Sequence, residues 1–319
     1  MVLLLQYTLI FASVLILVAL GGCFAEHSGV INLGLEGIMI MGALGGALAM
    51  RYISPNVPAI VMILGVLAIS ALVGMIYSCL LAVACINFKA DQTLVGTALN
   101  LLGTAGATVI VKAINTAANP DDVSSIIQYA GAKKAFVVNI GSFEFSWFML
   151  VTLLLLIGAY VVLYKTRFGL RLMACGEHPQ AADSVGINVY KMRYAGTTIS
   201  GALAGMGGFV YALTTANCTA NGDVAGFGFL ALAVMIFGNW KPLNIAGASL
   251  LFGLFKCIAA AYSSLDINGD GVYWLAEIGI SSHVYRMLPY LITLVVLAFT
   301  SKKSRAPKAE GIPYDKGQR

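Results

Sequence analysis

Two glutamates stand close together in an otherwise apolar stretch near the start of the chain. Glu26 and Glu36 enclose the segment 27–35, HSGVINLGL. A carboxylate at membrane depth is costly and therefore marks a candidate functional site. Glu26 is equally compatible with an interface position at the end of a span. Glu36 has apolar neighbours on both sides, so we expect it to line a polar pathway or to bond a break in a helix.

A second acidic pattern lies near the C-terminal end, in segment 266–277, DINGDGVYWLAE. It satisfies the calcium-loop pattern D-x-D/N-x-D/N-G-x5-E at every specified position. In such a loop the oxygen ligands come from the side chains of positions 1, 3 and 5, a backbone carbonyl at position 7 and a closing glutamate. Those positions are Asp266, Asn268, Asp270, Val272 and Glu277. The alternative is an ordinary external turn, which a composition rich in Asp, Asn and Gly also favours.

A third pattern is the polar segment 176–188, GEHPQAADSVGIN. Pro179 suits the first turn of a helix and Gly186 suits the position after its end. The spacing predicts a surface helix of about two turns that carries Ala181 and Ala182, whose small side chains allow another protein to approach closely. The alternative is a plain turn between two spans.

The composition defines the elements that position these residues. Of the 319 residues, 59% are hydrophobic and 10% are charged, and the mean hydropathy is +0.88. Soluble domains carry about 25% charged residues. These values exclude a soluble enzyme, a disordered chain and a nucleic-acid-binding module. A spanning helix needs about 20 apolar residues, so we predict an all-α, polytopic transmembrane bundle of about eight to ten spans, formed by residues 1–300.

Nine apolar runs are candidates for these spans. Two of them, 38–52 and 227–237, are short and follow glycine-rich, partly polar sequence. Helices broken at membrane depth are tolerated where they line a cavity, so we expect discontinuous helices along a central pathway. The nine runs are 3–24, 38–52, 57–86, 94–111, 147–164, 194–213, 227–237, 243–262 and 284–300.

The basic residues predict the orientation of the chain. Five of the 19 Lys and Arg residues lie in 165–193 and six follow Ser301. Such clusters beside spans mark the cytoplasmic side. The loop 165–193 and a basic tail, 301–319, are therefore predicted to be cytoplasmic, and segments 115–145 and 263–282 external. The chain is expected in the cell membrane, with no nucleic-acid partner.

Catalytic motifs are absent from the sequence. There is no phosphate loop GxxxxGKS/T, no HExxH and no GxSxG, and the three histidines lie far apart. The six cysteines are dispersed, without a CxxC pair. We therefore expect that the chain is not an enzyme, and that it has no cofactor of its own apart from the external calcium considered above.

Three of these segments together resemble a known family. The pattern E-x-x-x-A-A-x-x-x-G-I, at Glu177, Ala181, Ala182, Gly186 and Ile187, resembles the coupling loop of permease subunits of ABC importers. With SGVINLGLEGIMIMGA (28–43), it is similar to the branched-chain amino acid, ribose and nucleoside permease family. The segment GFGFLALAVMIFGNWKPL (226–243) is similar to the nucleoside and simple-sugar subgroup. Two residues depart from the family pattern: His27 replaces an arginine and His178 an asparagine.

The resemblance implies a division of labour among subunits. This chain would pair with a homologous second permease, a cytoplasmic ATP-binding subunit that hydrolyses ATP, and an external or periplasmic binding protein. The coupling loop, including Pro179, would receive the motion of the ATP-binding subunit. The subgroup implies nucleosides as substrates, and the candidate pathway residues are Asn32, Glu36, Asn100, Phe227 and Phe229, the two rings being able to stack on a base.

Other substrates and another mechanism stay open from the sequence. Simple sugars and branched-chain amino acids are transported by relatives within the same family. A stand-alone secondary transporter would use its broken helices to bind a solute and a coupling ion, and would transport without an ATP-binding subunit. The coupling-loop pattern argues against this mechanism.

The calcium-loop pattern yields a direct prediction. Calcium titration of the purified permease should change the fluorescence of Trp274 with a midpoint of about 10⁻⁴ to 10⁻³ M, the range of extracellular loops of this type. Glu277→Gln removes the closing ligand and should abolish the change. An unchanged signal up to millimolar calcium, or the same response in Glu277→Gln, would contradict a calcium site.

Overall fold

The computed structural model describes residues 2–53, 57–128, 136–141, 143–216, 219–262, 277, 281–300 and 305–317. The chain forms an all-α polytopic bundle, as predicted, and each of the nine apolar runs is helical over most of its length. The corresponding helices are α1 (Val2–His27), α2 (Leu35–Tyr52), α3 (Ala59–Ala82, followed by a π-helical turn Val83–Asn87), α4 (Gln92–Ala118), α5 (Trp147–Lys165), α8 (Val189–Thr214), α9 (Phe227–Phe237), α10 (Pro242–Ala261) and α12 (Ser282–Thr300).

Two further helices and two small two-stranded sheets complete the described elements. The loop between α5 and α8 contains α6 (Arg167–Glu177), which the sequence analysis did not predict, and α7 (Pro179–Ser184), which it did. Strand β1 (Ile127–Gln128) pairs with β4 (Thr219–Ala220), and β2 (Val137–Ile140) pairs with β3 (Phe143–Ser146). Within the described part of the chain, α1, α3 with its π turn, α4, α5 and α10 are long and apolar enough to cross a membrane.

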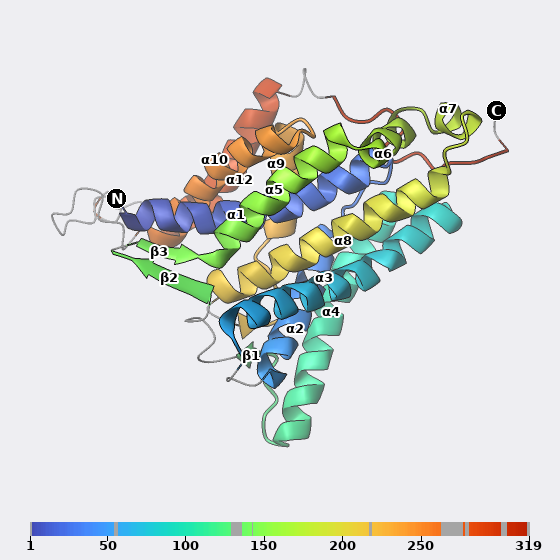
Figure 1. Ribbon diagram of the computed structural model, residues 1–319. Helices are drawn as coiled ribbons and strands as arrows, with labels where there is room; N and C mark the ends of the chain where they lie inside the picture. Colours follow the sequence, from blue (N-terminus) through green and yellow to red (C-terminus); the bar gives the residue numbers. More distant parts are fainter. Residues whose placement is uncertain are drawn as a thin grey trace.

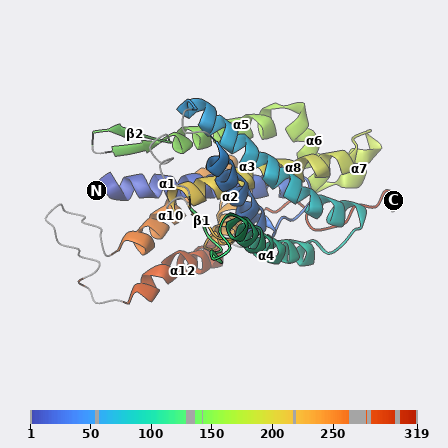
Figure 2. The ribbon, with the colours of Figure 1, turned by 90° about the horizontal axis from the view of Figure 1, so that it is seen from below.

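The bundle has two distinct ends (Figures 1 and 2). The start of α1 and the β2–β3 hairpin lie at one end, where the Gln6 side-chain amide donates a hydrogen bond to the Glu144 carboxylate, 3.2 Å away. Helices α6 and α7 and the chain's C-terminal residues lie at the other end. The amide of Ala309 donates to the carbonyl of Gly176 over 2.8 Å, which confirms that the basic loop and the tail share one side.

Helix α8 occupies the centre because its surface is made of small residues. A Cβ added at Gly205 would lie 2.4 Å from the backbone oxygen of Ser70 in α3, and one added at Gly208 would lie 2.0 Å from the backbone oxygen of Met39 in α2. Any side chain there would force the helices apart. Small residues at such positions let helix backbones approach closely, which is the main source of packing between helices in lipid. Helix α4 lacks a comparable neighbour on most of its surface and projects away from the other helices (Figure 1).

The two short helices begin in the interior of the bundle. Phe227, the first residue of α9, packs against Phe11 in the first half of α1, with ring centroids 6.0 Å apart. Trp240, just beyond the end of α9, accepts a hydrogen bond from Cys23 near the end of α1. Helix α9 therefore spans only the half of the bundle nearest α6. Helix α2 also begins among buried residues, at Leu35, so the predicted discontinuities are present in both places.

Candidate functional site

Two non-helical segments, 28–34 before α2 and 221–226 before α9, are here called the breaks. They meet at the Glu36 side chain. One carboxylate oxygen accepts a hydrogen bond from the amide of Gly226 (2.8 Å), and the other accepts from the amides of Gly228 (2.6 Å) and Phe229 (3.3 Å). The first amides of a helix have no partner within it and carry partial positive charge. Glu36, in the first turn of α2, thus supplies the hydrogen-bond acceptors for the amides at the start of α9. The residue is only 8% exposed.

The fit between these two helix starts is close. A Cβ added at Gly228 would lie 2.5 Å from the backbone nitrogen of Glu36, so only glycine lets the α9 backbone approach the carboxylate. Gly226 has a φ of +72°, a left-handed conformation that glycine adopts without steric cost. The glycines at the start of α9 therefore let its backbone turn and approach the Glu36 carboxylate.

Two asparagines hold the break that precedes α2. The Asn32 side-chain amide donates to the hydroxyl of Ser200 in α8 over 2.8 Å, and its oxygen accepts from the amide of Gly34. The Asn100 side chain, in α4, accepts from the amide of Gly37 and donates to the carbonyl of Leu33, both over 2.8 Å. The break is thus bonded to α4 and α8, and three of the backbone groups in and next to it have side-chain partners.

These contacts bear on the predicted pathway residues. The structure brings Asn32, Glu36 and Asn100 together around the breaks, where each of them bonds the chain itself. Direct contact with a solute would require some of these bonds to open, and it stays a prediction. Phe227 is 2% exposed, whereas Phe229, two residues further along α9, is 51% exposed. Phe229 therefore presents the more accessible ring.

Glu26 lies at the end of α1, as the interface reading predicted, but it is buried. Its carboxylate accepts a hydrogen bond from the indole nitrogen of Trp240, and the side chain of Glu310 lies next to it. Nε2 of His27 lies 2.9 Å from the carbonyl oxygen of the same tryptophan. Trp240 was not predicted as a site residue, and it has a φ of +55°. A bulky residue in that conformation is rare, and here it directs the indole toward Glu26.

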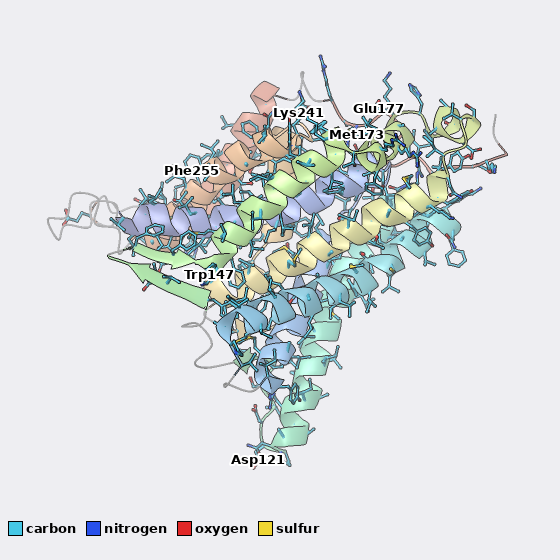
Figure 3. All side chains as sticks on the ribbon, in the orientation of Figure 1. Asp121, Trp147, Met173, Glu177, Lys241 and Phe255 are labelled. Atoms are coloured by element: carbon cyan, nitrogen blue, oxygen red, sulfur yellow. The ribbon has the colours of Figure 1, made fainter. Side chains whose placement is uncertain are left out.

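The predicted coupling residues form one compact turn at the end of the molecule. Helix α7 begins at Pro179, as expected, and the amide of Ile187 donates to the carbonyl of Ala182 over 3.0 Å. Gly186 has a φ of +86°. These are the features of a helix ended by a left-handed residue, so the predicted cap is confirmed. Glu177 is exposed at the end of α6, on the same end as Lys241 and opposite Trp147 (Figure 3).

The two alanines of this turn have different surroundings. Ala181 is exposed, in agreement with a surface offered to another protein. Ala182 is 4% exposed and packs with Cys175, Val189 and Tyr314. Both alanines were predicted to lie on the surface, and this was wrong for Ala182, because Tyr314 from the C-terminal tail covers it.

The predicted calcium loop falls almost entirely outside the described residues. This applies to Asp266, Asn268, Asp270 and Val272, whereas Glu277 is described and is exposed. Among the residues that the structure covers, no group of three or more His, Cys, Asp or Glu side chains is arranged to hold a metal ion.

Comparison with known proteins assigns the chain to a family. The model of the family described as "Branched-chain amino acid transport system / permease component" matches residues 4–297. The chain belongs to this permease family. It is a multi-pass protein of the plasma membrane and a transport subunit rather than an enzyme, which confirms both expectations. As a permease component it works with ATP-binding and substrate-binding components of an ABC transporter.

Individual relatives match nearly the whole chain. The guanosine ABC transporter permease protein NupQ of Bacillus subtilis is 39% identical over 98% of this chain and 96% of its own length. The nucleoside ABC transporter permease protein NupC of Lactococcus lactis is 37% identical over 97% of this chain and 96% of its own. The putative glucose ABC transporter permease protein TsgC13 of Haloferax volcanii is 29% identical over 93% and 91%. No solved structure matches the chain.

The two buried glutamates of this permease should differ in their effect on transport. Glu36→Ala leaves three backbone amides without their acceptor, and each such loss costs about 1–3 kcal/mol. Glu26→Ala leaves one indole donor unpaired. We expect solute uptake by the assembled transporter to fall more in Glu36→Ala than in Glu26→Ala, at equal amounts of permease in the membrane. Near-normal uptake in both variants would show that neither carboxylate is required.

Proposed function

We propose that this chain is the membrane permease of an ABC importer for nucleosides. It would pair with a homologous second permease and work with a cytoplasmic ATP-binding subunit and an external or periplasmic binding protein. The observation that carries the proposal is the match, over nearly the full length, to two permeases whose names specify guanosine and nucleosides. The exposed α7 turn supports the same assignment, since it offers a surface to an ATP-binding subunit.

The structure supports a route from α7 to the breaks. Helix α8 begins at Val189, five residues after α7 ends at Ser184, and further along it Ser200 accepts the hydrogen bond from Asn32. A rigid element that has two discrete positions is what transmission between distant sites requires. We propose that displacement of α7 moves α8 and thereby opens or closes the segment between α1 and α2.

A cavity near the hairpin end suits a neutral aromatic solute. It has a volume of about 310 Å³ and is lined by Phe11, Tyr211, Phe227, Tyr290 and Lys256, among others. The Lys256 ammonium lies 4.5 Å from the ring centroid of Phe227 and 5.6 Å from that of Tyr290. Aromatic faces bind bases by stacking, and the orientation predicted from the basic residues puts this cavity on the side from which an imported solute would enter. We propose that this cavity lies on the solute path.

Simple sugars and branched-chain amino acids are alternative solutes, but the support for them is weaker than for nucleosides. A glucose permease is among the relatives, at a lower identity of 29%, and the family description names branched-chain amino acids. An amino acid zwitterion needs charged partners of both signs, whereas the cavity offers one ammonium and several rings. For the external segment before α12, we also retain the proposal of a calcium loop closed by Glu277.

Competitive uptake tests the substrate assignment. Cells that contain the complete transporter should accumulate labelled guanosine, and unlabelled nucleosides should compete. Excess glucose, ribose or leucine should leave uptake unchanged. The same cells without this permease gene provide the control. Uptake that leucine or a sugar inhibits while nucleosides do not would contradict the proposal, as would gene-dependent uptake that continues without the ATP-binding subunit.

A further inference from the structure

The C-terminal residues 305–317, here called the strap, lie across the end of the bundle that carries α6 and α7 (Figures 1 and 2). Three backbone contacts fix the strap. The amide of Arg305 donates to the side-chain oxygen of Asn239 over 2.8 Å, the amide of Ala309 donates to Gly176, and the guanidinium of Arg193 donates to the carbonyl of Ile312 over 2.9 Å. The strap thus joins the loop between α9 and α10 to the end of α6 and the start of α8.

The strap also closes the hydrophobic cluster beneath α7. Tyr314 is 4% exposed and belongs to the cluster formed with Cys175, Ala182 and Val189. Its ring meets that of Tyr190 edge to face, with centroids 5.3 Å apart, and its hydroxyl lies near the side chain of Asp183 in α7. Tyrosine is the largest member of this cluster, so the strap supplies much of the apolar surface on which α7 rests.

Helix α7 needs such support because it is very short. It has six residues, and isolated helices shorter than about 12–15 residues are marginal in water. Its buried residues are Pro179 and Ala182, so its own apolar surface is small. The position of α7 must therefore be set by its neighbours, and among the described residues Tyr314 contacts both the buried side of the helix and one of its polar side chains.

The other end of the strap reaches the buried pair of glutamates. The side chain of Glu310 lies next to that of Glu26, the residue that accepts the indole hydrogen bond of Trp240. Asn239, which bonds Arg305, precedes that tryptophan. A displacement of α7 that moves the strap would therefore also act on the loop between α9 and α10. An ion pair between Lys89 and Asp315 (2.9 Å) adds a solvent-exposed link to the loop after α3, and exposed pairs of this kind contribute little.

We infer that the strap holds α7 in the position in which it receives the motion of the ATP-binding subunit, and that Tyr314 is a positioning residue for coupling. The inference rests on the proposed function. It gives residues 305–317 a role in passing the motion of the ATP-binding subunit to the membrane helices, which their basic composition alone does not indicate. If it holds, loss of the Tyr314 ring frees α7 while the spans and the breaks stay in place.

The test measures solute uptake and ATP hydrolysis together, in proteoliposomes that contain the complete transporter. In Tyr314→Ala we expect uptake per ATP hydrolysed to fall about fivefold or more, the lower end of typical coupling effects, while ATP hydrolysis continues. Tyr314→Phe keeps the ring and removes only the hydroxyl, so it should retain most of the coupling. Tyr52→Ala is the matched control and should behave as wild type, because Tyr52 is the last residue of α2 and is 73% exposed.

The outcomes separate the strap from the proposed function. Equal uptake per ATP in Tyr314→Ala and wild type would overturn the role of the strap and leave the proposed function intact. A parallel loss of uptake and ATP hydrolysis, in proportion to a lower amount of assembled permease, would also overturn it, because that is the effect of a purely structural residue. Wild-type proteoliposomes that take up no nucleoside would instead contradict the proposed function.

Discussion

The fold depends on one carboxylate that accepts hydrogen bonds from backbone amides left unpaired where helices are interrupted within the membrane. In the hydrocarbon region an unsatisfied backbone amide costs several kcal/mol, and non-helical backbone persists only where protein surrounds it. Glu36 provides two oxygens to three amides at the start of α9. The charge of the carboxylate also faces the positive end of that helix. One side chain thus makes two broken segments, far apart in sequence, depend on each other.

The remaining architecture brings these segments into contact and connects them to the end of the bundle that carries α6 and α7. Helix α8 is lined with small residues, so α2 and α3 approach its backbone, and its Ser200 bonds the break before α2. The same helix begins beside α7, the predicted contact for the ATP-binding subunit. A single rigid helix therefore touches both the coupling turn and the break. This arrangement supports the proposal that a displacement of α7 reaches the break.

Patterns within one segment were predictable from the sequence, and contacts between distant segments were not. Each of the nine apolar runs is helical, because hydropathy over a span is a local property. Pro179 and Gly186 marked the limits of α7 for the same reason. In contrast, the partners of Glu36 lie about 190 residues away, and nothing in either segment alone specifies the other. The burial of Ala182 depends on Tyr314, at the far end of the chain. Such pairings arise from packing and need the structure.

Hydrogen exchange at the start of α9 tests the central claim most directly. The amides of Gly226, Gly228 and Phe229 would be followed in the purified permease, in Glu36→Ala and in Glu26→Ala. If the Glu36 carboxylate holds the two breaks together, these amides are protected in the wild type and in Glu26→Ala, and they exchange markedly faster in Glu36→Ala, while α1 and α8 keep their protection. Equal protection of the three amides in all three proteins would contradict the account.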